Sequence, residues 1–163
     1  MVYILLGSGF EEAEALVAAD VLRRANLPVT LAGIGGEYVT GSHDITVKTG
    51  LPVGKVSLGK GDMVVLPGGM GGVASMEGSG AAMALIRRAA GDPELWLAAI
   101  CAAPTLLARA GAVPAMDRAA VTEGRLITGK GPGTAFDFAL ALVEALAGAE
   151  AAAQVRAGLH YGV

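Results

Sequence analysis

The chain has 163 residues and a formal net charge of −3, which fits a single domain with a buried core, because a chain of about this size hides roughly two-thirds of its unfolded surface. This acidic balance offers no basic patch to nucleic acid or to an anionic membrane, so we expect neither as a partner. The opening residues, MVYILLGSGF, lack the basic segment and long apolar run of a secretory signal, and we expect a cytoplasmic location.

Short runs rich in Val, Ile and Leu alternate along the chain with longer stretches of helical periodicity, which is typical of βα units and a parallel sheet. The expected fold is therefore one three-layer α/β sandwich over residues 1–163. We predict strands over 2–6, 28–34, 62–69, 95–100 and 125–128, a small antiparallel excursion over 38–56, helices over 11–26, 79–91, 132–148 and 149–158, a helical segment from 104, and a loop over 70–78.

Three unusual stretches follow predicted strands: GSGFEEAE after the first, PGGMGG after the central one, and CAAP after LWLAAI. Ligands of open α/β sheets bind outside the carboxyl ends of the strands, so these stretches are expected to meet at one edge. PGGMGG alone is more simply interpreted as a turn that needs positive φ.

Three other binding motifs fail on their details, and we expect no cofactor and no metal. GSGFEE resembles a dinucleotide loop, but carboxylates at the helix start would repel a pyrophosphate. GRLITGKG resembles a phosphate-binding loop, but Gly131 replaces the hydroxyl that would hold magnesium. No spacing brings two of His43, His160 and Cys101 together as metal ligands.

Cys101 is the only cysteine, and it lies where strand 95–100 enters a helix with no turn residues between them. An isolated cysteine with apolar neighbours is most simply a small core residue. The sharp joint instead predicts a nucleophile elbow, which lifts the thiol above the sheet edge. Helix N–H groups there favour the thiolate, so we expect a lowered thiol pKa. The backbone N–H groups of Gly69 and Ala102 are candidates for an anion hole.

A nucleophilic thiol needs a proton partner, and the candidates across the same edge are Glu11, Glu12 and Glu14. Glu11 and Glu14 share a helix face, while Glu12 points elsewhere, and at least one of the three is expected to be a solvated carboxylate. A carboxyl group beside the thiol would share one proton with it. His43 and His160 are more simply interpreted as surface or structural groups.

In combination, five motifs resemble the ThiJ/PfpI superfamily, in the branch of the parkinsonism-associated deglycase and bacterial YajL. They are GFEEAEA, ADVLRRA, VVLPGG, AAICAAP and GPGTAFDFALALVEALAG. The resemblance implies a flavodoxin-like homodimer, Cys101 as an oxidation-sensitive nucleophile, Glu14 as its protonated partner, and backbone donors at Gly69 and Ala102. Members are described as cofactor-independent glyoxalases, deglycases, redox-responsive chaperones and peroxide sensors.

Two departures from the family pattern qualify this resemblance. Ala102 occupies the position where the protease-like branch has histidine, which disfavours peptidase or amidotransferase chemistry. The connection after the elbow helix is short, so a strand-and-loop segment is expected to be absent between about 111 and 120.

Three hypotheses follow for Cys101. The first is a glyoxalase or deglycase that acts on methylglyoxal or its adducts with thiols and amines, with Glu14 moving the proton. The second is a non-enzymatic redox-responsive chaperone or oxidative-stress sensor that uses the same cysteine. The third is a structural cysteine in an inert domain, with an ordinary thiol pKa.

Overall fold

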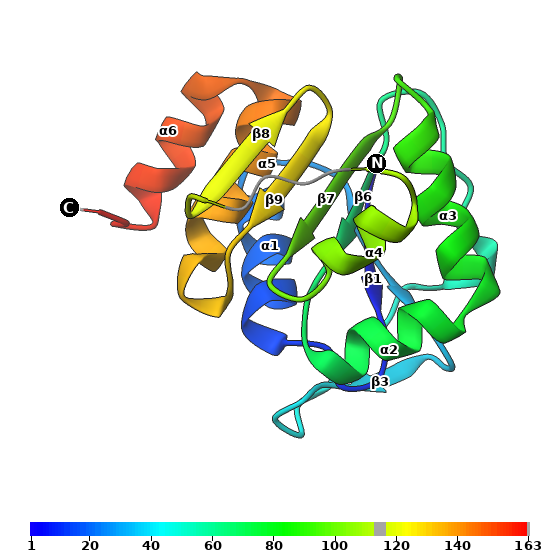
Figure 1. The fold of residues 1–163 in the computed structure, drawn as a ribbon. Coiled ribbons are helices and arrows are strands. Elements are labelled where there is room, and N and C mark those ends of the chain that lie inside the picture. Colours follow the sequence, from blue (N-terminus) through cyan, green and yellow to red (C-terminus); the bar gives the residue numbers. More distant parts are fainter. Residues whose placement is uncertain (113–116, 163) are drawn as a thin grey trace.

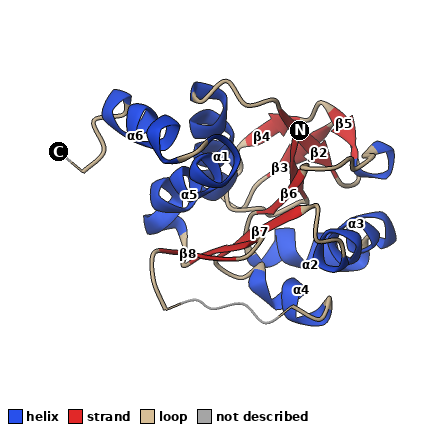
Figure 2. Ribbon diagram, turned by 90° about the horizontal axis from the view of Figure 1, so that it is seen from above, coloured by secondary structure: helices blue, strands red, loops and turns tan. Residues whose placement is uncertain are grey.

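The computed structural model describes residues 1–112 and 117–162, which form a sheet between two layers of helices (Figures 1 and 2). The sheet has seven strands in the order β5-β2-β1-β6-β7-β9-β8. Its strands are parallel except for β8, which pairs with β9 in the antiparallel direction. The bounds are β1 (Val2–Leu6), β2 (Val29–Gly33), β5 (Leu51–Pro52), β6 (Met63–Leu66), β7 (Trp96–Ile100), β8 (Ala120–Glu123) and β9 (Leu126–Gly129).

The helices divide between the two faces of the sheet, as the view from above shows (Figure 2). On one face α1 (Glu12–Arg24) packs against α5 (Ala135–Ala147), and α6 (Ala149–Gly158) packs against α5. The opposite face carries α2 (Met70–Gly78), α3 (Gly80–Gly91) and α4 (Pro104–Arg109). Two short 3-10 turns, η1 (Val53–Lys55) and η2 (Pro132–Thr134), complete these connections.

A separate two-stranded hairpin, β3 (Tyr38–Thr40) and β4 (Thr46–Lys48), lies over the loop that follows β1. Two backbone bonds attach it there: the Gly9 N–H donates to the Thr40 carbonyl at 2.8 Å, and the Ser42 N–H donates to the Phe10 carbonyl at 2.9 Å. The hairpin confirms the antiparallel excursion predicted from the sequence. Its turn is thereby held beside the N-terminus of α1.

The central strands are apolar because both of their faces are covered. Every residue of β6 is buried, and so are the last four residues of β7. Continuous Val, Ile, Leu and Ala runs are expected of parallel strands between helical layers, whereas a half-exposed strand would alternate with polar residues. The sequence-based α/β assignment is confirmed.

Three elements were not predicted: α2, β5 and β8. The glycines at 71 and 72 favour a loop over 70–78 in the sequence. In the structure they instead allow α2 to approach the loop after β1 closely. A methyl group added at Gly72 would lie 2.7 Å from the Phe10 Cα. Tertiary packing thus overrides the low helix propensity of glycine. Strand β8 pairs with β9 because Gly124, with a φ of +59°, permits the tight turn that leads from β8 into β9.

The expected absence of a strand-and-loop segment between about 111 and 120 falls partly on residues 113–116, which lie outside the described residues, so it stays a prediction. The same connection contributes β8 to the sheet edge. Among the described residues, no helix combines the length and apolar character needed to cross a bilayer.

Candidate active site

Cys101 follows β7 directly and adopts a left-handed backbone conformation with a φ of +63°. Such a φ is uncommon for a residue other than glycine and marks a turn that its surroundings hold in place. The Cys101 N–H donates to the Gly129 carbonyl at 3.0 Å, and the Ala103 N–H donates to the Ile100 carbonyl at 3.1 Å. Pro104 then begins α4, where no N–H is needed. The half-buried thiol therefore lies on a sharp strand-to-helix turn, as expected.

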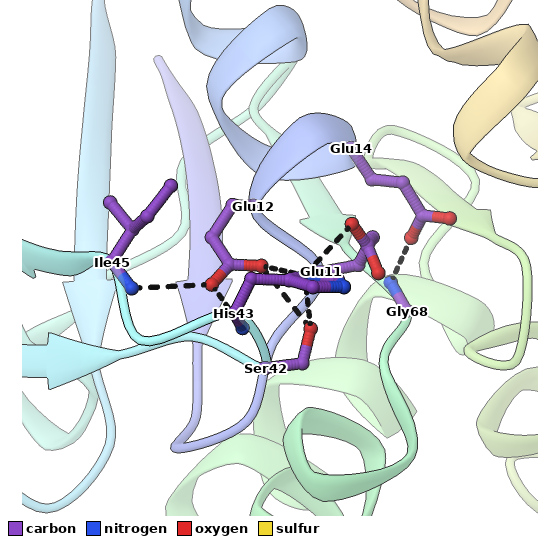
Figure 3. A network of polar contacts seen from close by, with 7 residues as sticks. All are labelled: Glu11, Glu12, Glu14, Ser42, His43, Ile45 and Gly68. Atoms are coloured by element: carbon purple, nitrogen blue, oxygen red, sulfur yellow. Dashed lines mark hydrogen bonds and ion pairs between the residues drawn. The ribbon is translucent and has the colours of Figure 1, made fainter.

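Glu14, in the first turn of α1, is the carboxyl group that the fold brings to this turn. Its side chain is 1% exposed, and its Oε2 accepts a hydrogen bond from the Gly68 N–H at 2.6 Å (Figure 3). A methyl group added at Gly68 would lie 2.7 Å from Glu14 Oε2 and 2.8 Å from Cys101 Cβ. Only a glycine therefore fits between the carboxyl group and the cysteine.

The thiol and the carboxyl group influence each other's ionisation. Burial raises the pKa of Glu14 above its ordinary value, although the Gly68 N–H opposes the change. Burial also raises the pKa of Cys101, and the Glu14 carboxylate adds to the effect by repulsion and by accepting a hydrogen bond from the thiol. The lowered thiol pKa expected from the helix terminus is therefore wrong. A proton on Glu14 would remove the repulsion between the two groups, while burial would still raise the thiol pKa.

The predicted backbone donors lie at the sulfur. The N–H groups of Ala102 and Gly69 both hydrogen-bond to Cys101 and act to lower its thiol pKa. Gly69 has a φ of +82°, and a methyl group there would lie 2.5 Å from the Gly9 carbonyl oxygen. The turn expected of PGGMGG thus directs an N–H group at Cys101. Two N–H groups at one atom form a site that stabilises negative charge.

An open cleft of about 470 Å³ leads to the thiol. Its walls come from the loop after β1, the β3–β4 turn, the start of α2 and the elbow. The lining residues are Gly9, Glu11, Ser42, His43, Gly69, Met70, Gly71, Cys101 and Ala102. Glu14 does not line the cleft, so it faces the sulfur from inside the protein.

A second polar cluster, which the sequence did not predict, adjoins the cleft: Glu12 with Ser42 and His43 (Figure 3). Glu12 is only 4% exposed, yet its pKa is lowered to about 2. Burial alone would raise that pKa, but hydrogen bonds from the His43 side chain, the His43 N–H and the Ile45 N–H outweigh it. Glu12 points away from Cys101, as its helix position indicated. It is buried under the hairpin turn, whereas Glu11 remains partly exposed at the cleft.

Glu11, Glu12 and His43 each place a potential ligand atom within 4.8 Å of the others. Sequence spacing did not bring these residues together, because folding of the hairpin over α1 creates the cluster. His43 Nδ1 already hydrogen-bonds to Glu12 Oε2 at 2.8 Å and lies 3.8 Å from Glu11 Oε1, so His43 pairs with both carboxyl groups. Elsewhere, His160 is exposed after α6, as predicted. Arg24 pairs with Asp20 at 2.7 Å on the exposed face of α1.

Sequence comparisons identify relatives over most of the chain. The sequence model described as DJ-1/PfpI family matches residues 1–116. The chain is 42% identical over 177 residues to protein dj-1beta of Drosophila melanogaster, covering 96% of this chain and 94% of that protein. It is 32% identical over 159 residues to glutathione-independent glyoxalase DJR-1.2 of Caenorhabditis elegans, covering 86% of this chain and 84% of that protein.

Solved structures share the whole architecture. The crystal structure of Drosophila melanogaster DJ-1beta matches with a TM-score of 0.91 at 39% identity, covering 99% of this chain and 98% of that one. The structure of oxidized Toxoplasma gondii DJ-1 matches with a TM-score of 0.89 at 26% identity, covering 99% and 98%.

Proposed function

Because this chain belongs to the DJ-1/PfpI family, we propose that it is a cysteine-dependent enzyme of the glyoxalase or deglycase type. It acts without a cofactor on methylglyoxal or on its adducts with thiols and amines. The observation that carries the proposal is the Cys101 thiol beside the buried Glu14 carboxyl group, with two backbone N–H groups at the sulfur. A relative named as a glyoxalase supports the same reaction class.

In the proposed reaction the Cys101 thiolate attacks the aldehyde carbon of methylglyoxal, and a carbon–sulfur bond forms. The electron pair of the carbonyl moves to its oxygen, where the N–H groups of Gly69 and Ala102 hold the charge until Glu14 supplies a proton. The Glu14 carboxylate then takes the hydrogen of that carbon as a proton and returns it to the neighbouring carbon, while the hydroxyl proton passes from the first oxygen to the neighbouring one. The product is a lactoyl thioester.

Water then hydrolyses the thioester and releases lactate and the free thiol. One carbon of the substrate is oxidised while its neighbour is reduced, so the net reaction consumes only methylglyoxal and water. Burial of Glu14 suits this role, because a carboxyl group with a raised pKa holds a proton more readily than an ordinary glutamate and can also give it back.

The test is the rate of lactate formation from methylglyoxal with the unmodified protein and with Cys101→Ala and Glu14→Gln. His160→Gln is the matched control, since His160 lies after α6 and away from the cleft. We expect turnover in the unmodified and control proteins and its loss in both site variants. An unmodified protein that forms no lactate would overturn the proposal.

A second candidate function uses the same thiol without turnover. Cys101 is half-buried at an open cleft, and peroxide would oxidise its thiolate to a sulfinate that accepts a hydrogen bond from protonated Glu14. Such a change of state suits a redox-responsive chaperone or an oxidative-stress sensor. Mass spectrometry after treatment with two equivalents of peroxide per thiol tests it, because each peroxide transfers one oxygen: we expect two added oxygens on Cys101, and faster over-oxidation in Glu14→Gln.

We further propose that the chain works in the cytoplasm as a homodimer, as the family resemblance implies. Its substrate-side partner is then a small reactive aldehyde or a glycated thiol or amine. Analytical ultracentrifugation at micromolar concentration tests the assembly, with a mass of twice 16.2 kDa expected for the dimer.

A further inference from the structure

His43 reaches the Cys101 cleft from the β3–β4 turn, although 31 positions separate it from its partner Glu12. Its side chain is 67% exposed, while the Glu12 side chain behind it is 5% exposed. Two bonds hold it against Glu12. The His43 N–H donates to Oε1 at 2.6 Å, and Nδ1 lies 2.8 Å from Oε2 (Figure 3). The imidazole is therefore fixed on its inner side and open to the cleft on its outer side.

The proton positions on this pair follow from its chemistry. An ionised carboxylate only accepts hydrogen bonds, so His43 Nδ1 carries a hydrogen and donates it to Glu12. When one ring nitrogen of a histidine is held by a hydrogen bond to a neighbouring residue, the other nitrogen remains available to bind a ligand. Here Nε2 forms no hydrogen bond within residues 1–112 and 117–162. It is thus the ring atom left for a molecule bound in the cleft.

We propose that His43, held by Glu12 and protonated on both ring nitrogens, presents its Nε2–H group to a substrate at Cys101 and donates a hydrogen bond to the oxygen on the carbon next to the one attacked. This inference rests on the proposed function and narrows its substrate class to small 2-oxoaldehydes. A simple aldehyde has no second oxygen, so it would not engage His43. No bond to the substrate is formed or broken by His43.

The charges around His43 favour the donor form of the ring. Glu12, Glu11 and Asp44 all face it, and they raise its pKa, with the Glu12 hydrogen bond as the largest cause. The raised pKa increases the fraction of molecules in which His43 is protonated near neutral pH, and in that form both ring nitrogens donate hydrogen bonds. When Glu14 removes the proton from the attacked carbon, negative charge spreads to the neighbouring oxygen. A positioned N–H donor stabilises that charge.

The test uses two alkylating agents of similar size, iodoacetate and iodoacetamide, at low ionic strength across pH 6 to 9. Both agents react with the same Cys101 thiolate. The rate with iodoacetate divided by the rate with iodoacetamide is therefore independent of the fraction of thiol that is ionised, and it depends on the charge in the cleft. The positive charge of protonated His43 attracts iodoacetate, the anionic agent, and so increases its rate relative to iodoacetamide. We expect this ratio to fall as pH rises, and to be lower in His43→Gln by roughly threefold at the acidic end.

Two further variants complete the design. His43→Lys restores a positive charge and should bring the ratio back towards that of the unmodified protein, whereas His160→Gln should leave it unchanged. Circular dichroism checks that each variant is folded. Identical ratio curves for the unmodified protein and His43→Gln would overturn the inference, and so would an unchanged kcat/KM of His43→Gln for methylglyoxal. An absence of lactate from every protein would count against the proposed function alone, because the alkylation ratio needs no turnover.

Discussion

Cys101 and Glu14 face each other across Gly68, whose missing side chain leaves the space that a methyl group would take from both. Gly68 also donates its N–H to Glu14, so one residue leaves room for the thiol beside the carboxyl group and orients the carboxyl group. The reactivity of this site then depends on where one proton resides. In the proposed mechanism the Cys101 sulfur acts as the nucleophile when the proton lies on Glu14.

Replacing Gly68 with alanine should damage both stability and activity. The added methyl group would meet Glu14 Oε2 at 2.7 Å, Cys101 Cβ at 2.8 Å and the Ile100 carbonyl oxygen at 3.0 Å. Overpacking of this kind lowers the free energy of unfolding by about 1–3 kcal/mol. Urea unfolding measures this difference. Gly78→Ala is the matched control, because nothing lies within 4 Å of a methyl group there, at the end of α2. Equal stability of the two variants would show that the space at Gly68 is not constrained.

Glu14→Gln should separate thiol reactivity from turnover. The neutral amide removes the repulsion that raises the thiol pKa, so the pKa of Cys101 should fall and iodoacetamide should react faster near neutral pH. The same amide cannot carry a proton between two carbons, so lactate formation should stop. The measurement is the pH dependence of alkylation beside a lactate assay. A thiol pKa that rises in the variant would contradict the account.

Glu12 should stabilise the fold in a defined range of pH. Its pKa is about 2 in the folded protein, below the ordinary value of 4.5, so its contribution is complete above about pH 4.5 and is lost as the pH falls towards 2. Urea unfolding from pH 6 to pH 3 measures this. The free energy of unfolding should fall with acid more steeply in the unmodified protein than in Glu12→Gln. Parallel curves would mean that the Glu12 network adds nothing to stability.

The sequence predicted the sheet well because both faces of its central strands are buried. Runs such as VYILL and MVVL carry a strong signal in that setting, and the joint at Cys101 was visible because LWLAAI passes into a proline-started helix without turn residues. Glu14 was one of three adjacent carboxylates, and their helix positions left two of them facing the thiol. The structure selects Glu14 through its bond to Gly68.

The rest required tertiary contacts. Helix α2 begins at a glycine-rich stretch whose propensity argues against a helix, and its packing on the loop after β1 offsets that cost. The pairing of Glu12 with His43 depends on a hairpin folding back over α1, which no local periodicity encodes. The rise in the thiol pKa likewise comes from burial and from a carboxylate distant in sequence.

The most direct test of the central claim is the amount of lactate formed per Cys101 thiol, followed by proton NMR with methylglyoxal in large excess over the protein. We predict that lactate accumulates to many molecules per thiol while the thiol is regenerated, and that Cys101→Ala forms none. A signal that stops at one modified thiol per chain would contradict the enzymatic account and leave Cys101 as a stoichiometric sensor of reactive molecules.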